Sequence, residues 1–241
     1  MMPDVSVLIP AYNAEKTITA AIYSAIDQCG VSVEVVVCDD GSTDGTLAAV
    51  QKLTDKFPSL MLVVHGQNQG LAPALNSAAG AASGRYFIEL DADDWLEACA
   101  LRKLVAALDG NPDKGFAYGQ TQYYGLSNYR HVPQAYRDGL FSYGFDSLYA
   151  FMYRRETWDA GCRYHSTCTI DGKTVTIQDW DMALQLVYYM RYQPIVVRDA
   201  LVLNYNHAHG SLTDFTEAHN GQVVRAFKDK WPMVAVNRII S

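Results

Sequence analysis

The stretch "RYFIELDADDWL" (residues 85–96) runs from a short apolar segment, typical of a buried β-strand, directly into Asp91, Asp93 and Asp94. A second stretch, "VEVVVCDDGSTDGT" (33–46), repeats this order, because a run of β-branched residues ends in two more acids. Carboxylates gathered at the ends of buried strands are costly unless something pairs with them. These two boundaries therefore indicate both a fold and a binding site.

Strand-like and helix-like patterns alternate through the first half of the chain. The strand-like runs are "VSVLIP" (5–10), "VEVVVCD" (33–39), "LMLVVH" (60–65) and "YFIEL" (86–90). Helical spacing appears in Ile18, Ile22 and Ile26, in Leu47, Val50 and Leu53, and in Leu101, Leu104, Val105 and Leu108. This alternation predicts an α/β fold with a Rossmann-like, mainly parallel (mixed) central sheet flanked by helices. Ligands of such sheets bind beyond the carboxyl ends of the strands, so we expect both acidic clusters at one edge.

The second half is less regular. After about residue 110 the chain becomes rich in Tyr and Gly; helical spacing returns from Asp179, followed by the strand-like "PIVVRDALVLNYN" (194–206). Without repeats or flexible linkers, we predict a single domain with two halves, 1–110 and 111–241. The tyrosines between 120 and 175 suit sugar stacking, an oligomer interface such as that of a homodimer, or a satellite core.

Composition excludes some classes of function. The 241 residues carry a formal net charge of −7 and contain no run of Lys and Arg, which argues against a nucleic-acid partner. No apolar stretch reaches the length of a transmembrane helix, and the start lacks the features of a signal peptide, so we predict a cytoplasmic protein. The C-terminal stretch 214–231 is weakly amphipathic and could dock on a membrane, on a partner or on its own domain.

The five cysteines are an odd number without CxxC spacing: Cys29, Cys38, Cys99, Cys162 and Cys168. Three of them lie within apolar periodic segments. This pattern predicts buried thiols rather than disulfides or zinc ligands.

The spacing of Asp91 and Asp93 puts both carboxylates on one side of an extended backbone. A divalent cation, Mg²⁺ or Mn²⁺, would relieve their repulsion and share its other positions with water and phosphate oxygens. The alternative is that Asp93 or Asp94 only caps a helix beginning near Glu97.

Asp39 and Asp40 also have two interpretations. Asp, Gly, Ser and Thr are common in any turn from a strand into a helix. Two adjacent acids exceed what a cap needs, however, and a carboxylate at this edge could accept the imide N–H of a uracil ring. A P-loop or GxGxxG motif is absent from the sequence.

Two further groups of residues are candidates for a site. Asp179 and Asp181 stand about 200° apart on a helical wheel, so only one of them can readily face a given site. A carboxylate in the first turn also suits the helix dipole, which is a purely structural role. His207 and His209 lie on one side of an extended segment and could bind a metal or a phosphate, or simply form polar surface.

Four motifs in this order together resemble the inverting glycosyltransferases of family 2, which have the GT-A fold. They are "VSVLIPAYNAEKTI", "VEVVVCDDGSTDGT", "NQGLAPALNSAAGAASGRYFIELDADDW" and "QDWD". The resemblance implies that Pro10, Ala11 and Tyr12 wall a nucleotide pocket, that Asp40 binds uracil and that Asp39 supports it. It further implies that Asp91 and Asp93 form a DxD element holding the metal and the ribose diphosphate, with Asp94 adjacent, and that Asp179 is the catalytic base.

The sequence departs from the family pattern at three places. Gln178 stands where a Glu usually precedes the catalytic Asp, and Leu75 stands where an Arg is expected to contact the donor. In the late "YRxHxxS" element, Asn206 replaces Arg and the histidines are displaced, which leaves His209 as a candidate ligand of the metal.

The resemblance implies a metal-dependent, hexosyltransferase-like enzyme of polysaccharide biosynthesis. A sugar would pass from a nucleotide diphosphate, such as UDP, to a hydroxyl of a carbohydrate or glycolipid acceptor, with inversion. Two alternatives stay open: a metal-dependent nucleotidyltransferase, for which Lys16 is the only basic residue near the first strand, and a catalytically silent module that binds nucleotide sugars.

Overall fold

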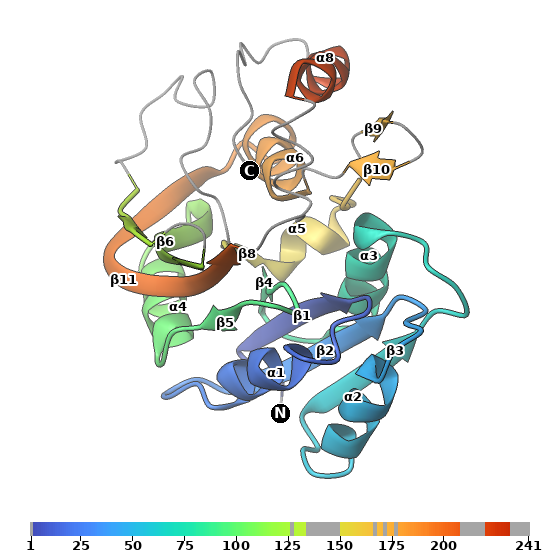
Figure 1. Cartoon of the computed structure of the whole chain (residues 1–241). Coiled ribbons are helices and arrows are strands. Elements are labelled where there is room, and N and C mark those ends of the chain that lie inside the picture. Colours follow the sequence, from blue (N-terminus) through green and yellow to red (C-terminus); the bar gives the residue numbers. More distant parts are fainter. Residues whose placement is uncertain are drawn as a thin grey trace.

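The computed structural model describes residues 2–125, 128–133, 150–165, 168–170, 173–175, 178–207 and 220–231. Helices flank a central sheet in this part of the chain (Figure 1). The helices are α1 (Ile18–Ile26), α2 (Thr46–Thr54), α3 (Leu71–Ala81), α4 (Ala100–Asp109), α5 (Arg155–Asp159), α6 (Gln178–Leu184), the π-helix η2 (Gln185–Tyr189) and α8 (Asn220–Lys230). No helix among the described residues is both long enough and apolar enough to cross a membrane.

The main sheet has nine strands in the order β3-β2-β1-β4-β8-β6-β11-β5, with β7 paired to β6. The strands are β1 (Val5–Ala11), β2 (Val33–Asp39), β3 (Leu60–Val64), β4 (Tyr86–Glu89), β5 (Trp95–Leu96), β6 (Lys114–Gly125), β7 (Arg130–His131), β8 (Met152–Arg154) and β11 (Gln193–His207). Strands β9 (Cys168–Ile170) and β10 (Lys173–Val175) form a separate antiparallel pair.

The first four strands are parallel, as the alternation of patterns predicted. β1 pairs with β2 on one side and with β4 on the other, and β2 pairs with β3. Their boundaries agree with the predicted ranges to within one residue, because each range is a short apolar run bounded by turn residues. The carboxyl ends of β2 and β4 therefore lie at the same edge of the sheet, where the acids were expected.

The other strands make the sheet mixed. β8 is antiparallel to both β4 and β6, whereas the long β11 is parallel to β6 and antiparallel to β5. Register shifts interrupt β11 between Val196 and Leu203, and Figure 1 shows this strand curving around one end of the molecule. β6 was not predicted from the sequence, since its Tyr- and Gly-rich residues lack a clean apolar alternation.

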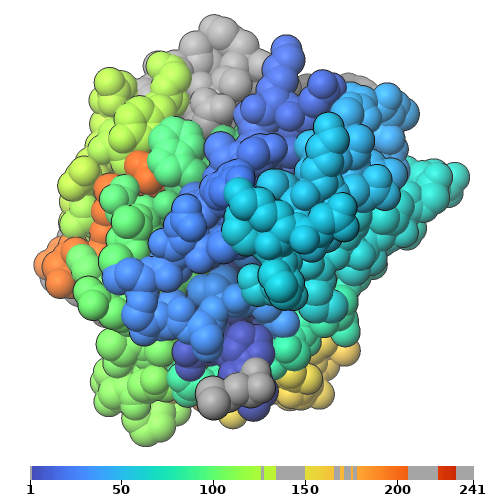
Figure 2. Space-filling view, turned by 90° about the horizontal axis from the view of Figure 1, so that it is seen from below, coloured from blue at the N-terminus to red at the C-terminus, as the bar shows by residue number. Residues whose placement is uncertain are grey.

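Alternate residues of the central strands feed two apolar cores. Val5, Val7 and Ile9 of β1 pack on the face covered by α1, α2 and α4. Leu8 points to the opposite core, which α3, α6 and α8 complete. Figure 2 views the first face, with the blue segments of α1 and α2 beside the green segment of α4.

Two cysteines form a disulfide, so the prediction of buried thiols is wrong for Cys29 and Cys99. Their Cα atoms lie 4.7 Å apart, because the loop that follows α1 meets the residue before α4. Sequence spacing could not show this contact across 70 residues. Cys38 and Cys162 are free and buried, as predicted, and the side chain of Cys168 lies outside the described residues.

A buried carboxylate ties three strands together. Glu34 in β2 is 8% exposed and accepts hydrogen bonds from the Ser6 hydroxyl (2.5 Å), the Ser83 hydroxyl (2.9 Å) and the Gly84 amide (2.9 Å). The Gly84 amide also lies 2.8 Å from the Ser6 Oγ. This network fixes the turn before β4 against β1 and β2, and so fixes where β4 begins.

We predict that Gly84→Ala destabilises the fold by about 1–3 kcal/mol, because overpacking forces the neighbouring backbone to move. An added Cβ would lie 2.5 Å from the Ser6 Oγ and 2.7 Å from the Ser6 backbone nitrogen. Urea unfolding measures the change. The control is Gly80→Ala in α3, where no atom lies within 4 Å of the added Cβ; equal stability of the two variants would contradict the prediction.

Candidate active site

Two loops at the carboxyl edge of the sheet are joined by hydrogen bonds. The Asp40 amide donates to the Ala11 carbonyl (2.8 Å), the Asn13 amide donates to the Ser42 hydroxyl (3.0 Å), and the Thr43 amide donates to the Asn13 side-chain oxygen (2.8 Å). Asn13 has a positive φ of 53°, which Asn tolerates better than most residues. The loops after β1 and β2 thus form one wall.

Residues Pro10, Ala11 and Tyr12 lie on this wall. Pro10 and Ala11 are buried at the end of β1, whereas the Tyr12 side chain is 49% exposed. An exposed aromatic ring beside a buried backbone edge can contact a planar base. Their predicted role as the wall of a nucleotide pocket stays a prediction.

Asp40 is buried and its carboxylate is fully engaged by the protein. Its Oδ1 lies 2.6 Å from the His65 Nδ1 and accepts the Gln69 amide at 2.9 Å. Its Oδ2 accepts the Gln69 amide at 3.1 Å and the Gly70 amide at 2.7 Å. Because Gly70 is the N-cap of α3, Asp40 anchors the start of that helix.

Asp39 has the opposite pattern. It is 1% exposed, its Oδ2 accepts the Ser42 amide at 3.3 Å, and its buried Oδ1 has no partner in the described part of the chain. A buried carboxylate oxygen without a donor is unfavourable. Of the two adjacent acids, Asp39 therefore has the free acceptor position.

Asp91 and Asp93 follow β4 at the same edge. Asp91 is half-buried and Asp93 is exposed. Burial raises the pKa of Asp91 to about 7, and the negative charges of Asp93 and Asp179 add to the shift. Partial desolvation also raises the pKa of Asp93. Asp91 is therefore close enough to both Asp93 and Asp179 for their charges to act on it.

The alternative role for Asp93 and Asp94 as helix caps is wrong. Helix α4 begins at Ala100, its N-cap Cys99 makes no side-chain cap bond, and the Leu101 amide in its first turn donates to the Gln28 side-chain oxygen (3.1 Å). Asp94 is buried, and its amide donates to the Asp91 carbonyl in a tight turn (3.1 Å). Among the described residues, the exposed Asp93 carboxylate therefore makes no capping contact with the first turn of α4.

Asp179 lies in the first turn of α6 and is half-buried. Its Oδ1 accepts the Trp180 amide at 2.8 Å, and burial raises the pKa of its carboxyl to about 6. A carboxylate with a raised pKa that is still ionised at neutral pH is suited to accept a proton.

Asp181, on the same helix, is occupied by structural contacts. It is 1% exposed; one oxygen accepts the Trp231 Nε1–H (2.8 Å) and pairs with the Lys230 ammonium (2.7 Å). The other oxygen accepts the Gln185 amide (2.9 Å) and lies 2.9 Å from the His165 Nδ1. Of the two acids on this helix, only Asp179 has capacity left for a ligand.

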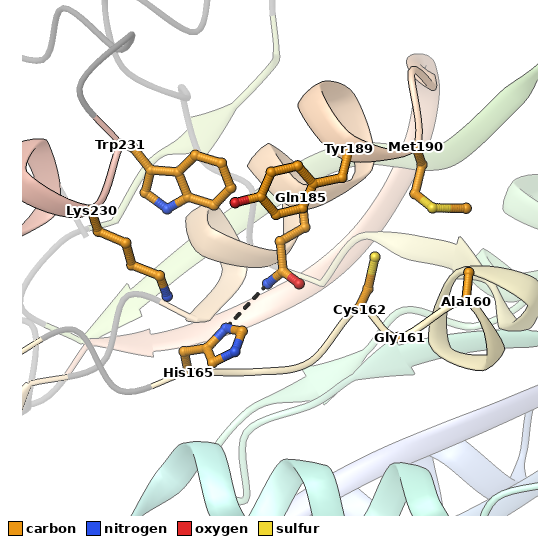
Figure 3. A pocket seen from close by; sticks show the side chains of 9 residues that line it. All are labelled: Ala160, Gly161, Cys162, His165, Gln185, Tyr189, Met190, Lys230 and Trp231. Carbon is orange, nitrogen blue, oxygen red and sulfur yellow. Dashed lines mark hydrogen bonds between the residues drawn. The ribbon is translucent and has the colours of Figure 1, made fainter.

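A cavity of about 370 Å³ lies beside these partners of Asp181. Figure 3 shows His165, Gln185 and Lys230 near one another, with the rings of Tyr189 and Trp231 above them and Cys162 to the side. The lining comes from η2 and Met190, from the segment 160–165 after α5 and from the end of α8, and Asp179 is not part of it.

The residues present fit a divalent cation. Asp91 and Asp93 offer the oxygen ligands that Mn²⁺ and Mg²⁺ prefer, and such ions take one or two carboxylates and complete their shells with water and phosphate. Within the described ranges, no three His, Cys, Asp or Glu side chains are grouped closely enough to hold an ion by themselves. A metal here would share its ligands with a phosphorylated compound.

Other predicted positions have different outcomes. Leu75 is fully buried in the core, so nothing at that position can contact a donor. The backbone of His207 ends β11, but its side chain and all of His209 lie outside the described residues. Sequence reasoning missed Asn76, whose side chain forms two hydrogen bonds with the backbone of Tyr164 (2.8 and 3.0 Å). The available signal was an amide side chain within an otherwise largely apolar helical stretch, 71–81.

The sheet order, the acidic edge and the flanking helices define a GT-A glycosyltransferase fold. TarS 1-349 from S. aureus, in complex with UDP-GlcNAc, aligns with a TM-score of 0.69 at 20% identity, covering 94% of this chain and 67% of that one. The mannosyltransferase PcManGT from Pyrobaculum calidifontis, in complex with GDP-Man and Mn²⁺, aligns with a TM-score of 0.72 at 21% identity, covering 96% and 65%.

The family model described as "Glycosyl transferase family 2" matches residues 6–171, so the chain belongs to this family. The succinoglycan biosynthesis protein ExoO of Rhizobium meliloti is 43% identical over 108 residues, 45% of this chain and 30% of that protein. The glucosyltransferase WfaP of Escherichia coli is 38% identical over 91 residues, 38% of this chain and 36% of that protein. The matches thus span about a third of these relatives.

We predict that Asp40→Asn lowers the free energy of unfolding by about 1–3 kcal/mol. The variant replaces one carboxylate oxygen with an NH₂ group, which cannot accept the hydrogen bonds that this oxygen now accepts. Asp39→Asn is the matched control. The Asp39 carboxylate accepts one weak hydrogen bond at 3.3 Å, and its other oxygen has no partner among the described residues, so the substitution removes little. Thermal and urea unfolding of both variants test this. A larger loss for Asp39→Asn would show that the assignment of the anchor is reversed.

Proposed function

We propose that this protein transfers a sugar from a nucleotide diphosphate, most simply UDP, to an acceptor hydroxyl with inversion at the anomeric carbon. The observation that carries the proposal is the unequal use of the acids at one sheet edge. Among the described residues, the buried Oδ1 of Asp39 has no donor and Asp179 accepts one backbone amide, whereas both oxygens of Asp40 and of Asp181 accept hydrogen bonds. Asp91 lies beside Asp179 and Asp93, whose negative charges raise its pKa.

The donor base would bind at the wall formed by the loops after β1 and β2. The free Oδ1 of Asp39 is buried at the end of β2, and an imide N–H of uracil would satisfy it. Tyr12 would cover the base. We therefore assign base recognition to Asp39 and assign to Asp40 the support of the adjoining loop, which reverses the order that the family resemblance implied.

The diphosphate would lie beside Asp91 and Asp93, which would hold a divalent cation between them and the phosphate oxygens. When bound, Mn²⁺ or Mg²⁺ neutralises the negative charge that develops on the leaving diphosphate. PcManGT, which shares the fold, is described in complex with Mn²⁺ and GDP-Man. Exposure of the Asp93 carboxylate gives such a cation access from solvent.

Asp179 would act as the general base. Its carboxylate removes the proton of the acceptor hydroxyl while that oxygen attacks the anomeric carbon, and the bond from this carbon to the diphosphate oxygen breaks on the opposite side. The donor would occupy residues 1–110, and the acceptor would bind mainly to residues 111–241, where exposed Tyr124 and Tyr129 offer stacking surfaces.

The relatives support an acceptor of the glycan or glycolipid class. WfaP is named as a glucosyltransferase that uses UDP-Glc and a GlcNAc-diphosphoundecaprenol acceptor, and ExoO is named for succinoglycan biosynthesis. Polysaccharide biosynthesis on the cytoplasmic side of a membrane, with peripheral contact to a lipid-linked acceptor, fits this class. Neither a nucleotidyltransferase nor a silent module explains why Asp179 keeps a free acceptor beside the acidic edge.

We predict that Asp39→Ala weakens UDP binding by about tenfold to a hundredfold, the range expected for a lost hydrogen bond to a charged group. The wild type should prefer UDP over CDP, because cytosine has no imide N–H, and the variant should lose this preference. Calorimetry with Mn²⁺ measures both. Asp55→Ala, an exposed acid at the end of α2, is the control. A preference that survives in Asp39→Ala would assign base recognition elsewhere.

The proposed function is tested by release of UDP from a panel of UDP-sugars with Mn²⁺ or Mg²⁺ and simple glycoside acceptors. We expect metal-dependent release by the wild type, a loss of at least about 10²-fold in Asp179→Asn with UDP binding retained, and weakened metal dependence in Asp93→Ala. Asp159→Asn, an exposed acid on α5, is the control. Unchanged turnover in Asp179→Asn would refute the role of Asp179 as general base. Release of pyrophosphate from UTP would favour the nucleotidyltransferase alternative.

A further inference from the structure

Glu89 is a buried acid that neither the fold nor the proposed reaction explains. It is the last residue of β4 and is 7% exposed. Its Oε1 accepts a hydrogen bond from the Gln178 amide at 2.9 Å, and its buried Oε2 has no partner in the described ranges. A carboxylate held in this way costs stability relative to an apolar side chain of similar size.

The position of the bond suggests why the acid is there. Glu89 precedes Asp91 by two residues along the same strand, and Gln178 immediately precedes Asp179 in the first turn of α6. The bond between them is therefore a direct link between the segment with the candidate metal ligand and the segment with the candidate base. It joins residues 89 positions apart in the sequence.

The Glu89–Gln178 bond connects the first turn of α6 to the sheet. Residues 176 and 177 lie outside the described ranges, and the helix begins at Gln178. Within the described residues, the hydrogen bond that the Asp179 side chain accepts comes from the Trp180 amide of its own helix. Gln178, 9% exposed, supplies a contact from this turn to β4.

We propose that Glu89 is a positioning residue, which through Gln178 holds the Asp179 carboxylate at its working distance from Asp91. This inference rests on the proposed function, in which Asp179 is the base and Asp91 lies beside the diphosphate. Glu89 does not touch the reacting atoms in this assignment. Its bond sets the separation between the base and the leaving group.

The bond can be broken and restored by exchange of its two side chains. Gln178→Glu removes the amide donor and places two carboxyl groups against each other, whereas the double exchange Glu89→Gln with Gln178→Glu restores an amide-to-carboxylate bond in the opposite sense. We expect Gln178→Glu to lower kcat by about tenfold or more, with the donor KM and UDP affinity unchanged, and the double exchange to recover most of that loss.

Gln185→Glu is the matched control. It makes the same substitution at another buried glutamine, and it places the new carboxylate against Asp181, away from Asp179. We expect a lower melting temperature with kcat within about twofold of the wild type, since this change does not alter the geometry of a reacting group. A kcat loss in Gln185→Glu equal to that in Gln178→Glu would mean that general destabilisation explains both, and would overturn the proposal.

Crystal structures of the wild type, Gln178→Glu and the double exchange provide a readout without turnover. We expect the separation of Asp179 and Asp91 to change in the single variant and to return in the double exchange. Unchanged placement of Asp179 in Gln178→Glu overturns the positioning role, even if no donor sugar is turned over. If the wild type transfers no sugar but Gln178→Glu shows the expected displacement of Asp179, the proposed function is contradicted and the positioning inference is supported.

Discussion

The parallel pairing of β1 with β2 on one side and with β4 on the other determines where the acids that follow β2 and β4 lie. Ala11 is in register with Asp39, and Leu8 is in register with Glu89, so the two acidic strand ends flank β1 at one edge. Neighbouring strands are separated by about 5 Å, so β2 and β4 lie about 10 Å apart across the sheet. That separation suits the two ends of one nucleotide diphosphate, and Glu34 protects it by fixing both strands to the turn at Gly84.

The cost of burying carboxylates separates the structural acids from the functional ones. Asp40 and Asp181 have donors for both oxygens. Burial raises the pKa of both Asp91 and Asp179, and the charges of Asp93 and Asp179 raise the pKa of Asp91 further. A divalent cation bound at Asp91 would favour the ionised carboxylate and so offset this cost.

Much of this arrangement follows from the sequence, but the partners of individual acids do not. Apolar runs bounded by turn residues located the four parallel strands, and their shared direction brought the acids to one edge. Pattern could not distinguish Asp39 from Asp40, because the distinction depends on His65 and Gly70, which arrive from the next loop. The Cys29–Cys99 disulfide and the Glu89–Gln178 bond were equally hidden, since each joins segments that only the folded sheet brings together. β6 was missed because its aromatic residues obscure the alternation of a strand.

The acidic loop after β4 is held at both ends, which bears on how it could bind a ligand. β5 follows the acids at once and pairs with β11 through Leu96 and Leu203, and the Glu97 amide donates to the Val202 carbonyl at 2.9 Å. Two residues after Glu97, the disulfide of Cys99 with Cys29 ties the chain to the loop that follows α1. Asp91 and Asp93 therefore stand in a short span fixed by β4 on one side and by β11 and α1 on the other. A span fixed in this way loses little conformational freedom when a cation binds, so most of the binding free energy remains available to orient the diphosphate.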